Sequence, residues 1–408
     1  MSEAMNASMG TPPRLAVDGL LDDPQTRIIV CCGAGGVGKT TTAAALGVRA
    51  AERGRKAVVL TIDPARRLAQ SMGIDSLDNT PRKVSGVSGD GGELHAMMLD
   101  MKRTFDEIVE GHSDPERAQA ILANPFYQSL SAGFAGTQEY MAMEKLGQLR
   151  SRDDWDLIIV DTPPSRSALD FLDAPGRLGS FLDGKFIRVL MAPAKVGGRA
   201  GMKFLNVGMS MMTGTLSKLM GASLLKDVQT FVAAMDTMFG GFRTRADATF
   251  QLLQAPGTAF LVVAAPEADA LREAAYFVER LAAERMPLAG LVLNRVHVSG
   301  ADQLSAERAL AAAENLEDGG IVDQEPGNAG LRDSDSDADV DEITAGLLRL
   351  HAERMQVIAR EQRTRDRFTS LHPEVAVAEV AALPGDVHDL AGLRAIGERL
   401  SAGAPAGA

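Results

Sequence analysis

Short apolar runs alternate with longer stretches of helical periodicity along most of this 408-residue chain. Apolar runs that are separated by helical stretches are typical of buried parallel strands. The pattern therefore predicts an α/β fold with a doubly wound, mostly parallel sheet that is covered by helices on both faces. We expect strands at residues 27–32, 57–62, 93–99, 156–160, 259–264, 289–293 and 374–381.

Two segments interrupt this alternation. Residues 177–254 show no strand pattern and contain eight of the 19 methionines, and they predict a helical insertion subdomain. Flexible methionine side chains on helices can line a groove for apolar segments or fill gaps in an ordinary helical core, and both interpretations stay open. Residues 301–342 end in a dense run of aspartates, whose mutual repulsion predicts a partly disordered acidic insert.

Directly after the first predicted strand, the chain carries the pattern G-x-x-x-x-G-K-T of a phosphate-binding P-loop. Its residues are Gly33, Ala34, Gly35, Gly36, Val37, Gly38, Lys39 and Thr40. The glycines let backbone N–H groups turn towards phosphate oxygens, and the following helix adds its positive end. Lys39 is placed to reach the β- and γ-phosphates, and the Thr40 hydroxyl to hold Mg²⁺. The chain is therefore predicted to bind a nucleoside triphosphate with Mg²⁺.

Polar residues follow three other strands that end at the same edge of the predicted sheet. Asp63 can orient an attacking water, although an aspartate before Pro64 also suits a turn or a helix cap. Asp161 ends the fourth predicted strand and is expected to bind Mg²⁺ through water. Asn294 can read a base edge, and His297 stands where guanine-selective proteins place an aspartate, so we expect ATP rather than GTP.

The formal net charge of −12 disfavours nucleic acid and constitutive membrane binding, because both need a basic face. Residues 1–25 have neither the basic start nor the apolar core of a signal peptide, and no apolar run is long enough to span a bilayer. We expect a cytoplasmic protein with a disordered N-terminus at residues 1–25, one P-loop ATPase domain at 26–400 and a disordered tail at 401–408.

These motifs resemble, in the same order, those of the ArsA-type P-loop ATPase family, which contains the arsenical pump ATPase and the guided-entry ATPase for tail-anchored membrane proteins. The family's loop G-K-G-G-V-G-K-T-T compares with residues 33–41. Its first switch, T-D-P-A, is similar to residues 62–65, and its second switch to residues 161–172. The resemblance spans residue 27 to about residue 400 and implies the family's fold and ATPase activity.

The resemblance also implies roles for single residues. Thr41 joins the loop residues that contact the nucleotide, and Asp63 becomes the water-orienting aspartate. Asn294 falls where the family reads adenine, and Leu383 with Pro384 resembles the loop that covers the adenine.

Three departures from the family pattern change the expected function. Ala34 stands where the family has a lysine that crosses the dimer interface to the partner's phosphates. Arg166 and Ser167 replace a Gly-His pair of the second switch. The sequence has neither a zinc-binding C-x-x-C nor a cysteine triad for trivalent arsenic, which disfavours arsenite transport.

The sequence is thus predicted to encode an Mg²⁺-dependent ATPase whose ATP binding and hydrolysis change the conformation of a dimer. The missing loop lysine favours a heterodimer with a paralogue that carries it, or otherwise a homodimer, with an apolar client segment as a further candidate partner. One alternative is a weakly hydrolysing, nucleotide-binding half of a heterodimer. Another is a positioning ATPase of the cell-division type, which the charge and the missing lysine disfavour.

Overall fold

The computed structural model describes residues 12–63, 67–87, 89, 91–131, 137–163, 244–317 and 334–402. Its centre is an eight-stranded sheet with the order β3-β4-β2-β5-β1-β6-β7-β8. The strands are β1 (Ile28–Cys32), β2 (Lys56–Thr61), β3 (Arg82–Lys83), β4 (Glu93–Met98), β5 (Leu157–Asp161), β6 (Thr258–Ala264), β7 (Leu288–Val296) and β8 (Val377–Ala381). All pairings are parallel except that of β3 with β4. The predicted α/β class is confirmed, and β3 was missed because two residues carry no periodicity.

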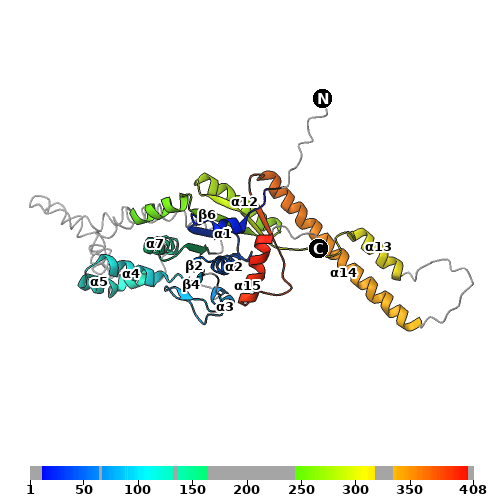
Figure 1. Cartoon of the computed structure of the whole chain (residues 1–408), viewed down its shortest axis with the longest axis horizontal. Helices are drawn as coiled ribbons and strands as arrows, with labels where there is room; N and C mark the ends of the chain where they lie inside the picture. Colours follow the sequence, from blue (N-terminus) through cyan, green and yellow to red (C-terminus); the bar gives the residue numbers. More distant parts are fainter. Residues whose placement is uncertain are drawn as a thin grey trace, which may run out of the picture.

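Helices cover both faces of this sheet (Figure 1). They are α1 (Val17–Asp22), α2 (Lys39–Glu52), α3 (Arg67–Ser71), α4 (Met101–His112), α5 (Pro115–Leu122), α6 (Pro125–Ser131), α7 (Thr137–Arg152), α12 (Ala268–Ala283), α13 (Ala306–Glu317), α14 (Ser334–Leu371) and α15 (Leu390–Ala402). Helices α1, α2 and α15 share one apolar core, and α7, α12 and the root of α14 share the other. Among the described helices, none is both long and apolar enough for a membrane span.

The central strand β1 is buried on both sides and separates the two cores. Ile28 and Val30 face the core of α7 and α12, whereas Ile29 faces the core of α2 and α15. Cys31 and Cys32 alternate in the same way, and both are buried free thiols. Because neighbouring strand residues point to opposite faces, these two cysteines act as small core residues rather than as a disulfide.

The prediction that residues 1–25 are disordered is wrong for residues 12–25. Helix α1 packs on α2, and its Leu21 has no exposed surface. The buried guanidinium of Arg55 explains this order, because it donates to the carbonyl oxygens of Leu21 (2.8 Å), Asp23 (2.9 Å) and Thr26 (2.7 Å). Residues 1–11 lie outside the described residues.

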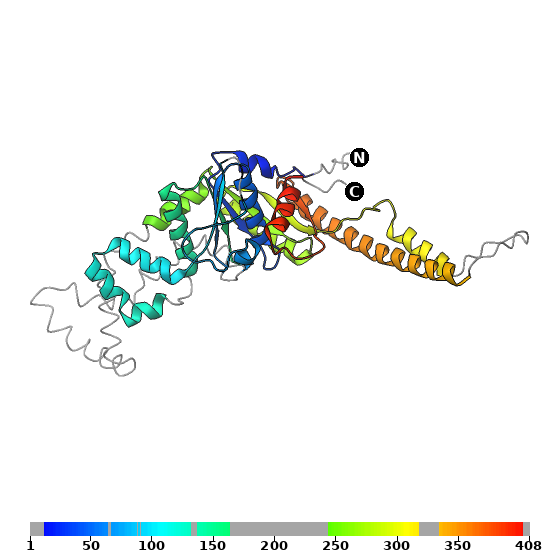
Figure 2. The ribbon, with the colours of Figure 1, turned by 60° about the horizontal axis from the view of Figure 1, so that its bottom comes forward.

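Much of the predicted acidic insert at 301–342 is helical instead of disordered. Helix α13 lies within it, and α14 begins at Ser334, inside the run of aspartates. Carboxylates in the first turns of a helix interact favourably with its positive end, which offsets part of their mutual repulsion. Together α13 and α14 form a helical arm that extends away from the sheet (Figure 2).

Other predicted boundaries are only partly covered by the structure. Residues 244–254 of the predicted helical insertion are helical, and residues 177–243 lie outside the described residues. Residues 318–333 and 403–408 also lie outside them, while α15 continues to Ala402, into the predicted tail.

We predict that Leu21→Ala lowers the free energy of unfolding by about 2–5 kcal/mol, because it leaves a cavity between α1 and α2. Urea unfolding followed by circular dichroism measures this change. Leu20→Ala, at a half-buried position of the same helix, is the matched control and should cost clearly less. Equal effects of the two variants would mean that α1 does not pack as described.

Candidate functional site

The P-loop curls around the carboxyl end of β1 through glycines in left-handed conformations. Gly33, Gly36 and Gly38 have φ values of 144°, 75° and 95°. A Cβ on Gly33 would lie 2.1 Å from the carbonyl oxygen of Val263, and one on Gly38 would lie 2.2 Å from the Nδ2 atom of Asn294. Side chains are therefore excluded at positions 33 and 38 by both conformation and space. The neighbouring sheet holds the loop in this shape.

Lys39 begins α2 and folds back over the loop. Its ammonium donates to the carbonyl oxygen of Ala34 at 2.7 Å, and the side chain is buried. Burial lowers the pKa of Lys39, and the carboxylates of Asp161 and Asp63 partly oppose that shift. A desolvated ammonium surrounded by loop N–H groups favours an anionic ligand, because the added negative charge compensates for the lost water.

Asp161 at the end of β5 has no exposed surface. Its Oδ2 atom accepts hydrogen bonds from the hydroxyls of Thr40 and Thr61, each at 2.8 Å. Its Oδ1 atom is buried and has no hydrogen-bond partner in the described part of the chain. Burial raises the pKa of this carboxyl to about 6, against the lowering effect of the two hydroxyls. The free oxygen beside a threonine hydroxyl fits the water shell of Mg²⁺.

Asp63 follows β2 at the same edge of the sheet. Its backbone N–H donates to the hydroxyl of Thr61 at 3.2 Å. It lies two residues after Thr61, which is paired with Asp161 across β2 and β5, and its charge raises the pKa values of both Lys39 and Asp161. The preceding Ile62 is fixed from another element, because the Gln138 side chain of α7 donates to its carbonyl oxygen at 3.0 Å. The structure thus brings three predicted site residues together.

The end of β7 contacts the P-loop directly. The Asn294 amide donates to the carbonyl oxygen of Val37 at 2.9 Å, and the Arg295 guanidinium donates to that of Gly36 at 2.7 Å. Arg295 adopts φ 62° where the pairing of β7 with β8 shifts register, between Asn294 and Val296. The sequence analysis missed Arg295, because neither this shift nor the left-handed backbone leaves a signal in the hydrophobic pattern.

For the remaining residues that were predicted to contact the nucleotide, the structure gives burial but few contacts with the rest of the site. Gly35 is exposed at the loop tip, and Thr41 is half-buried in the first turn of α2. Leu383 packs against the core that contains the P-loop residue Val37, whereas Pro384 is exposed. The adenine contacts of Asn294, Leu383 and Pro384 therefore stay predictions. Arg166 and Ser167 lie outside the described residues.

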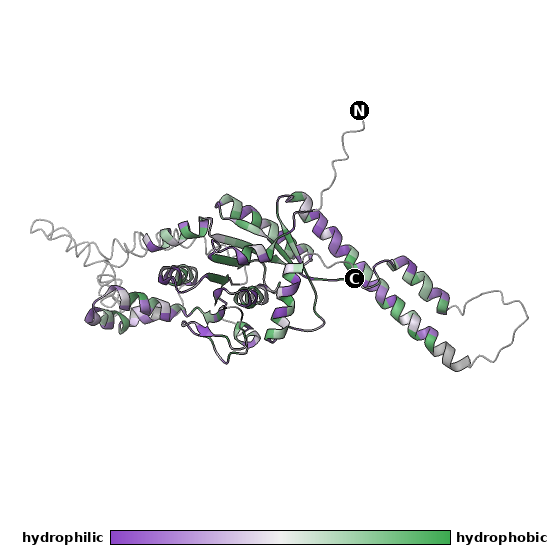
Figure 3. Ribbon diagram, in the orientation of Figure 1, coloured by the Kyte–Doolittle hydropathy of each residue, from purple (hydrophilic) through white to green (hydrophobic). Residues whose placement is uncertain are grey.

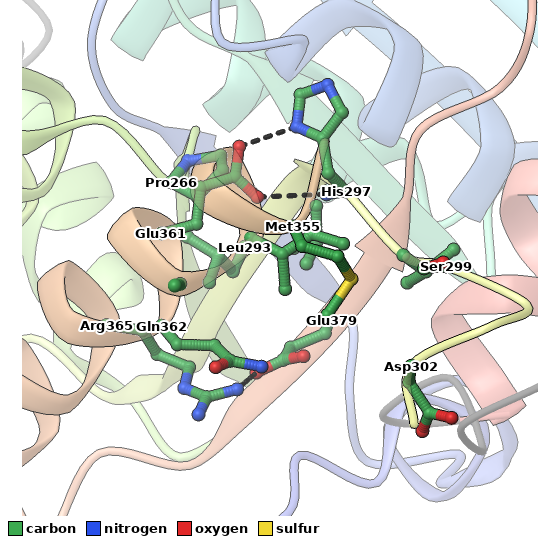
Figure 4. A pocket seen from close by; sticks show the side chains of 14 residues that line it. Pro266, Leu293, His297, Ser299, Asp302, Met355, Glu361, Gln362, Arg365 and Glu379 are labelled. Carbon is green, nitrogen blue, oxygen red and sulfur yellow. Dashed lines mark hydrogen bonds and ion pairs between the residues drawn. The ribbon is translucent and has the colours of Figure 1, made fainter. Parts of the chain in front are cut away.

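A pocket of about 450 Å³ opens where the end of β7 meets α14 (Figure 4). Glu361 of α14 accepts from the backbone N–H of His297 at 3.0 Å, and its other carboxylate oxygen lies 2.6 Å from the Nδ1 atom of that residue. On the opposite wall, Arg365 donates to Glu379 of β8 at 3.0 Å. The two contacts tie α14 to the sheet, one just after the end of β7 and one in the middle of β8.

Comparison with known proteins gives the family of this chain. The model of the family described as "Anion-transporting ATPase" matches residues 26–317. ATPase GET3 of Malassezia globosa is 31% identical over 167 residues, which cover 41% of this chain and 47% of that protein. ATPase GET3 of Podospora anserina is 26% identical over 280 residues, covering 68% of this chain and 75% of the relative.

A similar match links the chain to ATPase ASNA1 homolog 2 of Paramecium tetraurelia, with 24% identity over 285 residues that cover 68% of this chain and 78% of the relative. The match thus spans about half of the Malassezia protein and about three quarters of the other two. The family model covers well over half of the 408 residues and includes the P-loop and both aspartates. The chain therefore belongs to the anion-transporting ATPase family and is an ATPase.

Proposed function

We propose that this ATPase hydrolyses ATP with Mg²⁺ at the P-loop and that nucleotide turnover changes the conformation of a dimer. The observation that supports this proposal best is the environment of Asp161. Its buried carboxylate accepts a hydrogen bond from the hydroxyl of Thr40 in the first turn of α2. Its other oxygen has no protein partner among the described residues. The adjoining loop passes close to β6 at Gly33 and close to β7 at Gly38.

The phosphates would lie in the loop. Backbone N–H groups around Gly36 and Gly38 and the ammonium of Lys39 supply the positive potential for the β- and γ-phosphates. Asp63 would accept a hydrogen bond from a water molecule and orient it towards the γ-phosphorus. Attack by that water breaks the bond to the β–γ bridging oxygen and yields ADP and inorganic phosphate.

Thr40 and Asp161 would hold the metal ion, Thr40 through its hydroxyl and Asp161 through a bound water. The ion, when bound, neutralises charge on the phosphate oxygens. A bound metal ion would also stabilise the ionised form of Asp161, which burial otherwise disfavours.

A dimer is implied by the resemblance to the ATPase family, and the loop sequence bears on its composition. Ala34 is buried and uncharged, so this chain has no side chain there that could reach the phosphates of a partner. We propose a heterodimer with a paralogue that supplies a loop lysine to this chain's P-loop, with an apolar segment as candidate client. The alternative of a weakly hydrolysing half of such a dimer is favoured by the same residue.

We predict that Asp161 makes the protein free of nucleotide and metal less stable as the pH rises. The folded protein raises the pKa of Asp161 from 3.8 to about 6, so it holds an extra proton between these values. Its contribution to the free energy of unfolding is present below pH 4 and is lost, by about 3 kcal/mol, as the pH rises through 6.

Urea unfolding at a series of pH values tests this sign. Asp161→Asn should gain stability relative to the native chain between pH 4 and 6.5. Asp154→Asn, at an exposed position, is the control and should keep the native pH profile. If the free energy of unfolding of Asp161→Asn changed with pH in the same way as that of the native chain, the prediction would be contradicted.

We predict that Asp63→Asn retains ATP binding and slows hydrolysis by about 10²–10⁴-fold, because it removes a proton acceptor at nearly constant shape. Lys39→Ala should lose binding as well, since the loop loses its ammonium. Binding of a fluorescent ATP analogue and single-turnover phosphate release separate the two effects. If Asp63→Asn hydrolysed ATP at the native rate, Asp63 would be a turn residue without a catalytic role.

We predict that Ala34→Lys raises the ATPase activity of the chain alone by about a hundredfold, the contribution of one well-placed cationic donor to the transition state. Ala34→Met is the matched control, because it adds similar length without charge. A paralogue that retains the lysine should stimulate the native chain to a similar extent. Full activity of a native homodimer would overturn the heterodimer hypothesis and point to another cation, such as Arg295.

A further inference from the structure

Helix α14 has two halves with different surroundings. The half near the body packs on the sheet, where Ile358 and Phe368 are buried and Arg354 donates to the carbonyl oxygen of Val298 at 2.8 Å. The other half extends beyond the body as an arm and has α13 as its described neighbour (Figures 1 and 2). With 38 residues, the helix is about 57 Å long.

The arm carries an exposed apolar stripe, defined as Val340, Ile343, Leu347 and Leu350. Their exposed fractions are 59%, 64%, 62% and 63%. They are four of only six large hydrophobic residues that are strongly exposed in the described part of the chain. Apolar residues of the arm are visible in Figure 3. Their spacing of three, four and three residues is the a/d pattern of a coiled-coil seam.

Helix α13 does not cover this stripe. The two helices of the arm meet through small residues that are fully buried, Ala309 and Ala313 of α13 and Ala345 and Ala352 of α14. The stripe lies on another face of α14, which is the continuation of the face where Ile358 is buried and Glu361 contacts His297. An apolar stripe of this size on an otherwise polar arm indicates a contact surface.

We propose that the stripe binds the same stripe of a second copy of this chain, with the two α14 helices antiparallel. The spacing is symmetric about Ala345, so an antiparallel pair places Val340 opposite Leu350 of the second copy and Ile343 opposite Leu347 of the second copy. The surface is therefore complementary to itself through a two-fold axis, as an isologous interface requires. Thr344 and Gly346 flank the axis, and their small size lets the helices approach closely.

The charges of α14 select the antiparallel orientation. Residues 335–342 contain five carboxylates, and residues 349–367 contain six arginines. A parallel pair would place the two acidic segments side by side, which costs repulsion. An antiparallel pair keeps the two acidic segments apart, so repulsion between like charges favours this orientation.

The seam is short, and the stripe is on the arm rather than at the P-loop. We therefore expect a weak, reversible dimer that forms without nucleotide. It is separate from the nucleotide-linked dimer proposed above, so the failure of one does not affect the other.

Cross-linking of cysteine variants tests the orientation. Full-length Val340→Cys and Leu350→Cys chains are mixed without nucleotide and treated with a short bis-maleimide. The mixture should cross-link, while each variant alone should not, because equal residues lie about 15 Å apart in the antiparallel pair. The native chain is the control, since Cys31 and Cys32 are buried. Cross-linking of each variant alone, or no cross-linking at all, would overturn the proposal.

Sedimentation analysis of full-length variants tests the seam. Leu347→Lys should weaken self-association by about a hundredfold or more, because the dimer would bury two unpaired charges, and should leave ATP hydrolysis unchanged. Gln356→Lys is the matched control, because it adds the same charge at an exposed position off the stripe. A native chain that stays monomeric at about 100 μM without nucleotide, or equal association of the two variants, would overturn the proposal.

Discussion

The carboxylate of Asp161 is the point on which the site depends. Three segments meet at this fully buried carboxylate: the end of β5, the hydroxyl of Thr61 at the end of β2, and the hydroxyl of the half-buried Thr40 in α2. A buried carboxylate is costly unless hydrogen bonds compensate, so these three segments must keep their relative positions. The parallel direction of β1, β2 and β5 makes this possible, because it brings their carboxyl ends to one edge.

The same burial links stability to function. An enzyme without a ligand keeps a carboxylate whose charge is disfavoured, and a cation at the site would remove that penalty. The buried carboxylate of Asp161 therefore influences both the stability of the fold and the affinity for a cation. Such coupling is common where pKa values are perturbed. The loop glycines add a second rigid element, since Gly33 and Gly38 have no room for a side chain against β6 and β7.

Most of the framework could be predicted from the sequence, because its signals are local. Buried parallel strands are continuous apolar runs, and the P-loop is one short pattern between a strand and a helix. The elements that the sequence analysis missed depend on contacts between distant residues. Residues 12–25 are ordered by the guanidinium of Arg55, and Arg295 reaches the loop through a backbone irregularity in β7. The acidic run where α14 begins was predicted to be disordered because only the repulsion between its carboxylates was considered, and not their favourable interaction with the positive end of a helix.

The contacts at the end of β7 connect the P-loop to the arm. Among five consecutive residues at the end of β7 and just after it, Asn294 and Arg295 contact the P-loop, and His297 and Val298 contact α14 through Glu361 and Arg354. This short stretch therefore connects the P-loop to α14, whose segment between Ser334 and Glu361 is about 40 Å long. A rotation of one degree about Glu361 would displace the distal end at Ser334 by about 0.7 Å, so the length of the arm would enlarge any small change at the strand end.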